Sequence, residues 1–132
     1  MPKLAVSDDY IDLPDLGGGI TVPLLSSSGT EEFLLDVRRN RINLTKGTFQ
    51  NRSRSVIILA RLDVGGAPHR NPDGQEVQCP HLHIYREGYG DKWAVPAGSR
   101  LMLGADHWSA IQAFMSFCNV VKQPNFNPGL FA

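Results

Sequence analysis

The chain has 132 residues, of which 42% are hydrophobic and 20% are charged, and its formal net charge is zero. This length suits one domain, residues 1–132, and the composition excludes a disordered or fibrous protein. No apolar run reaches the roughly 20 residues of a membrane-spanning helix, no secretory signal follows Met1, and the two cysteines form no C-x-x-C pair, so we expect a cytoplasmic protein without a membrane partner.

Residues 1–30 form an acidic segment that is rich in loop signals. Ser7, followed by early aspartates, predicts a short helix before Pro14. Residues 20–22 predict a short strand, and the serine-rich run after it is typical of a loop. The sheet is therefore expected over residues 31–96.

Within that range the hydrophobic pattern is typical of strands. Residues 31–40 place Phe33, Leu35 and Val37 on one face, whereas residues 41–49 alternate less cleanly. Residues 56–64 are a nearly continuous β-branched run, which is typical of a central strand. Further strands are expected over residues 81–87 and 93–96, and the short links favour an antiparallel meander of about five strands.

The connection over residues 65–80 is longer than most ordered loops. It contains Asn71-Pro72-Asp73-Gly74, a strong turn signal. Long loops in compact domains are often functional, and this one brings His69 beside the strand that follows it.

Residues 105–120 predict a helix. Asp106 can cap it, and apolar residues recur at helical spacing from Trp108 to Cys118. This stripe indicates packing against the sheet. The predicted fold class is α+β, an antiparallel sheet of about five strands with the C-terminal helix packed on one face.

The zero net charge conceals an asymmetry. Residues 1–36 carry seven acids and one lysine, a net charge of −6, whereas residues 37–62 carry seven cations and no acid. Such a basic block can bind phosphates, and it can equally be neutralised by the acidic N-terminal segment. The candidate nucleic-acid contacts are Arg38, Arg39, Arg41, Lys46, Arg52 and Arg54.

The strand over residues 81–87 is the strongest candidate for a functional site. Strand side chains alternate, so two histidines, a tyrosine and a glutamate share one face. In the strand before it, Arg61 and Asp63 share a face and would lie beside the histidines if the register is right. The candidate catalytic residues are His69, His81, His83, Arg61, Arg86, Tyr85 and Glu87.

Metal-independent cleavage of RNA, as in a toxin-type ribonuclease, is the first of three chemistries that fit this set. His81 and His83 would be general acid and base, with His69 as an alternate, because the imidazole pKa lies near neutrality. Arg61 or Arg86 would stabilise the transition state, and Tyr85 and Glu87 would orient the imidazoles. Such an enzyme needs no cofactor, because the 2′-hydroxyl of RNA is a built-in nucleophile.

Two other functions remain open. The same face could bind a protein partner without catalysis, as an inhibitor or adaptor, because Tyr and Arg are favoured at interfaces. A metal-binding enzyme could use His69, His81 and His83, since a catalytic zinc site commonly has three protein ligands. Glu87 lies too far along an extended strand to share an ion with His81, so we expect no bound metal.

Several runs in the chain resemble the signature of a family of small uncharacterised bacterial and prophage domains. They are residues 69–74 (HRNPDG), 81–90 (HLHIYREGYG) and 93–96 (WAVP), together with residues 32–37 (EFLLDV) and 117–119 (FCN). The similarity spans most of the chain. It implies a bacterial, mobile-element setting, where small proteins are often toxins or inhibitors of defence systems, but no established activity.

Overall fold

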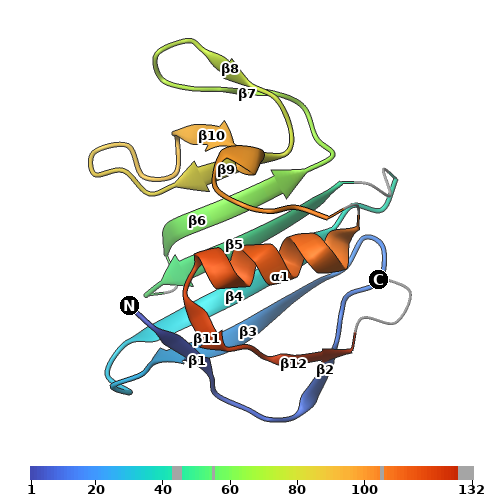
Figure 1. Cartoon of the computed structure of the whole chain (residues 1–132), viewed down its shortest axis with the longest axis vertical. Helices are drawn as coiled ribbons and strands as arrows, with labels where there is room; N and C mark the ends of the chain where they lie inside the picture. The colour runs from blue at the N-terminus through green and yellow to red at the C-terminus, as the bar shows by residue number, and fades with distance from the viewer. Residues whose placement is uncertain (43–45, 55, 105, 128–132) are drawn as a thin grey trace.

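The computed structural model describes residues 1–42, 46–54, 56–104 and 106–127. They form an α+β fold built on an eight-stranded mixed sheet, in the order β10-β9-β6-β5-β4-β3-β1-β11 (Figure 1). The strands of this sheet are β1 (Lys3–Ala5), β3 (Gly19–Ser26), β4 (Glu32–Arg39), β5 (Gly47–Ser53), β6 (Ile57–Val64), β9 (His81–Ile84), β10 (Ala94–Pro96) and β11 (Val120–Lys122). The predicted class is confirmed, whereas the prediction of about five antiparallel strands is wrong.

The meander is the part of the sheet that the sequence predicts well. From β3 to β6, and on to β9 and β10, each strand pairs antiparallel with the one before it in the sheet. The chain ends extend it, because β1 pairs antiparallel with β3 and parallel with β11. Strands of three residues are too short to show a hydrophobic period, and their partners lie at the other end of the chain.

Three local predictions need correction. The segment between Ser7 and Pro14 forms no helix. Instead β2 (Tyr10–Asp12) pairs parallel with β12 (Asn125–Asn127) in a small second sheet. The strand predicted over residues 41–49 begins only at Gly47, and its Leu44 lies outside the described residues. The long loop contains a third, two-stranded sheet, β7 (His69–Arg70) with β8 (Glu76–Val77), whose turn is closed by the Gly74 amide bonding to the Asn71 carbonyl, as its turn signal predicts.

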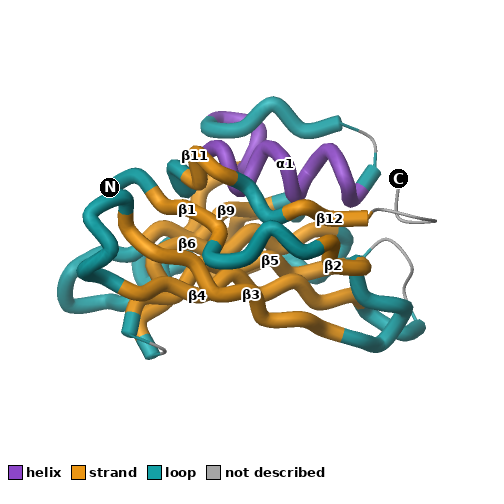
Figure 2. The backbone as a smooth tube through the Cα atoms, turned by 90° about the horizontal axis from the view of Figure 1, so that it is seen from below, coloured by secondary structure: helices purple, strands orange, loops and turns teal. Residues whose placement is uncertain are grey.

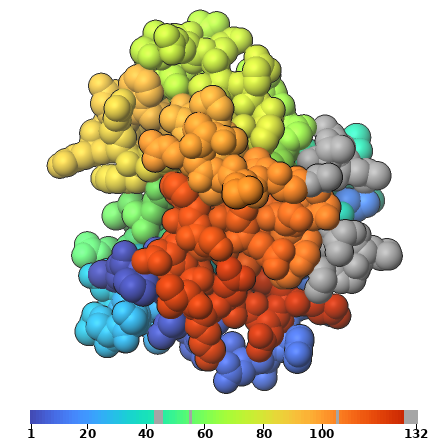
Figure 3. All heavy atoms as spheres, viewed as in Figure 1, coloured from blue at the N-terminus to red at the C-terminus, as the bar shows by residue number. Residues whose placement is uncertain are grey.

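Helix α1 (His107–Phe117) packs on one face of the main sheet (Figure 2). The Asp106 carboxylate caps it by accepting a hydrogen bond from the Ser109 amide at 2.7 Å, as predicted. Its buried residues Ile111, Phe114 and Met115 join the hydrophobic core. The segment from the 3₁₀ turn η1 (Ala97–Ser99) through α1 to β12 covers the middle of this face (Figure 3). In the part of the chain that the structure describes, no helix is long and apolar enough to cross a bilayer.

The other face of the main sheet is polar, because side chains alternate along each strand. Its residues align in two rows across neighbouring strands, which we call the polar sheet face. One row is Thr21, Asp36, Gln50, Arg61 and His83; the other is Arg38, Thr48, Asp63 and His81. Both rows run from the middle of the sheet to the histidines of β9.

Candidate functional site

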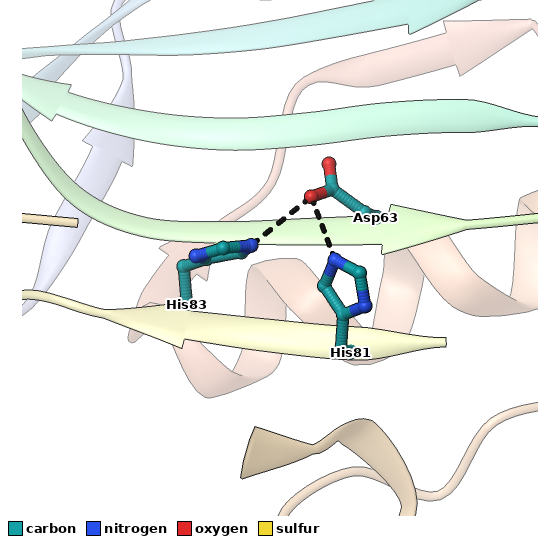
Figure 4. Close-up of side chains that lie close together, drawn as sticks. All are labelled: Asp63, His81 and His83. Carbon is teal, nitrogen blue, oxygen red and sulfur yellow. Dashed lines mark hydrogen bonds and ion pairs between the residues drawn. The ribbon is translucent and has the colours of Figure 1, made fainter. Parts of the chain in front are cut away.

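Pairing of β6 with β9 brings the candidate residues together. The register places Arg61 opposite His83 and Asp63 opposite His81. Sequence alone left this register open, since a slip of one residue would separate them. Figure 4 shows both imidazoles directed to the Asp63 carboxylate from the neighbouring strand.

The third histidine, His69, joins this group from β7. Its ring centroid lies 4.5 Å from that of His83 and 5.8 Å from that of His81, and the His81 and His83 centroids are 5.0 Å apart. These rings border a pocket of about 340 Å³, which we call the histidine pocket. Its lining also includes Lys46, Thr48, Arg61, Asp63 and Cys79.

Asp63 lies at the centre of the cluster. Its Oδ2 is 3.1 Å from His81 Nε2 and 3.2 Å from His83 Nε2, and its Oδ1 accepts a hydrogen bond from Thr48 at 3.1 Å. Burial raises the pKa of the Asp63 carboxyl, but the contacts with His83 and Arg61 outweigh it and bring the pKa to about 2. Asp63 is therefore ionised at neutral pH.

His83 is buried, and its partners assign its tautomer. Nδ1 donates to the Asp91 carbonyl at 2.7 Å, and Nε2 lies 3.0 Å from Nη2 of Arg61. A guanidinium can only donate, so Nε2 of the neutral ring accepts from Arg61. The same Nε2 lies 3.2 Å from Asp63 Oδ2, to which it donates when it carries a proton.

The other two imidazoles are also held through one ring nitrogen. His69 Nε2 donates to the Lys92 carbonyl at 2.6 Å, which leaves the lone pair on Nδ1. His81 donates from Nε2 to Asp63, and its Nδ1 lies 3.5 Å from Cys79 Sγ. Burial lowers the pKa of His81 by more than the Asp63 charge raises it, so this ring is neutral at neutral pH.

Two carboxylates hold the guanidinium of Arg61 beside the imidazoles. Arg61 Nη1 donates to Asp91 Oδ2 at 2.8 Å, and Nε lies 3.3 Å from Asp63 Oδ2. Asp91 and Cys79 are site residues that sequence reasoning missed. Asp91 follows the turn after β9, and no periodic pattern marks it; Cys79 lies two residues before His81, which was a usable signal.

The predicted row of four groups on one strand ends after His83, because β9 ends at Ile84. Tyr85 is 44% exposed, and the residues after it turn back, with the Tyr89 amide bonded to the Arg86 carbonyl. The Arg86 guanidinium lies over the Trp93 ring, 4.4 Å from its centroid. Tyr85, Arg86 and Glu87 are not among the residues that line the histidine pocket.

The basic block divides into parts. Arg38, Arg39 and Lys46 line a second pocket of about 230 Å³, and the Arg41 side chain packs against Gly17 in its wall. The second pocket shares Lys46, Gly47 and Thr48 with the histidine pocket. The two others are elsewhere: Arg52 is bonded to Asp36, and Arg54 follows the opposite end of β5.

Comparison with known proteins shows the family of this chain. The model of a family described as "Family of unknown function (DUF6978)" matches residues 1–120. No curated protein and no solved structure matches the chain.

Proposed function

We propose that this chain, which belongs to that family of unknown function, is a small nucleic-acid-directed enzyme that cleaves RNA in the histidine pocket. The observation that supports this most is the continuity of two pockets. The histidine pocket and the pocket beside Arg38 share Lys46, Gly47 and Thr48. A polyanion lying in this combined groove would pass the imidazoles.

The cations along the groove suit the phosphates of a nucleic-acid strand. Arg38 and Asp63 lie in the same cross-strand row, two strands apart, so their backbones are separated by roughly 10 Å. Arg38 is exposed, and Lys46 lies between the two pockets. Binding through such contacts releases counterions and depends steeply on salt.

Proton transfer is best assigned to His69. His81 and His83 are 3% and 1% exposed, and both nitrogens of each ring already have partners. His69 is only half-buried and presents the lone pair of Nδ1. It is therefore the imidazole that a substrate hydroxyl can reach.

The reaction needs a proton acceptor, a proton donor and a positive charge. His69 Nδ1 takes the proton of the 2′-hydroxyl, the 2′-oxygen bonds to phosphorus, and the bond to the 5′-oxygen breaks. Arg61 and Lys46 stabilise the charge of the phosphorane. The 5′-oxygen takes a proton from water, and His69 returns its proton to the hydroxide that remains. The products are a 2′,3′-cyclic phosphate and a 5′-hydroxyl.

The test uses a single-stranded RNA and its 2′-deoxy counterpart. Wild type should cut the RNA to cyclic phosphate ends and leave the deoxy strand intact. His69→Ala should lower the rate by at least about a hundredfold, as expected when a general base is lost, and should leave RNA binding unchanged. The matched control is His107→Gln, which changes a histidine that packs on Phe49 outside the pocket.

Equal cutting of the deoxy strand, or full activity of His69→Ala, would contradict the mechanism. Undetectable RNA binding at low salt would remove the proposal altogether and favour the protein-partner alternative.

A further inference from the structure

The strongest unexplained feature of the site is the convergence of one carboxylate oxygen and two imidazole nitrogens. Asp63 Oδ2 is 3.1 Å from His81 Nε2 and 3.2 Å from His83 Nε2. Ligand atoms gathered in this way are stabilised by a positive charge beside them. In the structure the Arg61 guanidinium supplies that charge, with Nη2 3.0 Å from His83 Nε2 and Nε 3.3 Å from Asp63 Oδ2.

We propose that Asp63, His81 and His83 form a binding site for a divalent transition-metal ion of the zinc class. Each residue offers one ligand atom, and these three atoms lie within 4.8 Å of one another. Asp63 Oδ2 and the Nε2 atoms of the two histidines are the atoms that face each other. This inference does not depend on RNA cleavage, because it stands on the arrangement of the three side chains alone.

The spacing of the ligand atoms fits such an ion. Bonds of about 2.0–2.2 Å in a tetrahedral arrangement put neighbouring ligand atoms roughly 3.3 Å apart. Asp63 Oδ2 is 3.1 Å from His81 Nε2 and 3.2 Å from His83 Nε2. Both pairs therefore need to move by only a few tenths of an ångström.

The outer partners of the histidines also fit. A metal-bound imidazole usually donates its other N–H to a carbonyl or carboxylate, which fixes the ring and directs the lone pair to the metal. His83 has this arrangement, because its Nδ1 donates to the Asp91 carbonyl at 2.7 Å. His81 would reach it by moving its proton to Nδ1, where Cys79 Sγ is the partner at 3.5 Å.

Arg61 does not need to leave the site for the ion to enter. It would give up its contacts with His83 and Asp63 and keep its hydrogen bond to Asp91 Oδ2 at 2.8 Å. The guanidinium would then border the open coordination position and could hold an anionic oxygen there. Two imidazoles and one carboxylate favour zinc or a similar ion over magnesium or calcium, which take oxygen ligands.

The carboxylate of this site is Asp63, and the expectation of no bound metal was based on Glu87. Glu87 lies in the turn beyond β9 and not on the strand, and it is not among the residues that line the histidine pocket. However, the neighbouring strand supplies Asp63 through the β6–β9 register. The carboxylate ligand is therefore Asp63 from the neighbouring strand, whereas the sequence suggested Glu87 from the histidines' own strand.

The experiment measures zinc retained after loading with Zn²⁺ and dialysis, by elemental analysis. Wild type should retain stoichiometric zinc. Asp63→Asn should retain none, because this near-isosteric change removes the charged ligand atom, and His83→Gln should behave alike. The controls are His107→Gln and Asp36→Asn, which change the same residue types outside the cluster and should retain zinc as wild type does.

A second readout uses Co²⁺ in place of Zn²⁺, with the visible absorption of the bound ion as the signal. Wild type should show the intense bands of a four-coordinate site, and Asp63→Asn should show none. Circular dichroism of each variant confirms that it is folded. Wild type that retains no more zinc than Asp63→Asn would overturn the inference, as would zinc that Cys79→Ser or His69→Ala loses and Asp63→Asn keeps. RNA cleavage is not measured, so failure of that proposal leaves this result unchanged.

Discussion

Two aspartates on the polar sheet face, Asp36 and Asp63, make the most instructive comparison in this molecule. Each is largely buried, and each lies beside an arginine, Arg52 or Arg61. Burial raises the pKa of both carboxyls, but their hydrogen bonds and ion pairs lower it by more, so the pKa of each is below its ordinary value. By burial and charge alone they are the same kind of group.

Their hydrogen bonding differs. Asp36 accepts from Thr21 Oγ1 at 2.6 Å, from Gln50 Nε2 at 2.8 Å, and from both Nε and Nη2 of Arg52. These four donors match the roughly four lone-pair sites of a carboxylate. Asp63 instead accepts from Thr48 and Arg61, contacts the two imidazoles of His81 and His83, and borders a pocket. Burial and charge pairing are therefore common to both carboxylates, and the feature that distinguishes Asp63 is the imidazole pair beside a cavity.

The largest expected effect is on the stability that Asp36 and its hydrogen-bond partners contribute. Asp36→Asn removes the charge that pairs with the Arg52 guanidinium and should lower the free energy of unfolding by about 3 kcal/mol, the low end for a broken buried pair because Arg52 stays partly hydrated. Denaturant unfolding of the variant measures this. The control is Asp9→Asn on the exposed surface, and an Asp36→Asn loss no larger than the control's would contradict the account.

Acid should remove part of the same stabilisation. The pKa of Asp36 is lower in the folded chain than its unfolded value near 3.9, so its contribution is complete above that pH and is lost as pH falls through the folded-state pKa. The stability difference between wild type and Asp36→Asn should therefore shrink below about pH 4. Unfolding curves of both proteins across this range measure it, and a constant difference would count against the role of this carboxylate.

A smaller effect is expected for RNA binding. Replacing Arg38 and Lys46 by Ala should remove two phosphate contacts and reduce the log–log salt slope by about 1.4, a change of roughly 25-fold in affinity over a tenfold salt range. Arg54→Ala/Arg100→Ala makes the same charge change elsewhere on the surface and should leave the slope unchanged. Equal effects of the two double variants would mean that binding follows net charge and not the groove.

The smallest effect on folding should come from Asp63→Asn in metal-free protein. The amide can donate to Nε2 of the neutral His83 ring, and Arg61 keeps its hydrogen bond to Asp91. The free energy of unfolding should stay within about 1 kcal/mol of wild type. A loss as large as that of Asp36→Asn would mean that Asp36 and Asp63 contribute to stability in the same way.

The elements that could be predicted from the sequence are those that a local residue pattern encodes. Alternation predicted the strands around Phe33 and Leu62 and the common face of His81 and His83, and helical spacing with a cap predicted α1. It did not reach β1 with β11 or β2 with β12, because pairing between distant short segments leaves no local period. The sheet was therefore predicted too small.

The candidate site followed the same rule. His69, His81, His83 and Arg61 were found because they are rare polar groups on strands or in a marked loop. The structure separates Arg52 from the rest of the basic block because Asp36, two strand residues short of Arg38 on the same face, binds it. Which cation meets a phosphate and which meets a carboxylate depends on register, and register is a property of the paired strands.

The most direct test of the proposed metal site at Asp63, His81 and His83 is the position of a bound ion in crystals grown with Zn²⁺. Anomalous diffraction at the zinc absorption edge locates that ion. The account predicts one strong peak about 2.0–2.2 Å from Asp63 Oδ2, His81 Nε2 and His83 Nε2, with Arg61 turned to Asp91. A peak bound through His69 or Cys79 without Asp63, or an Asp63 that still contacts Arg61 and His83 with no zinc beside it, would contradict the account.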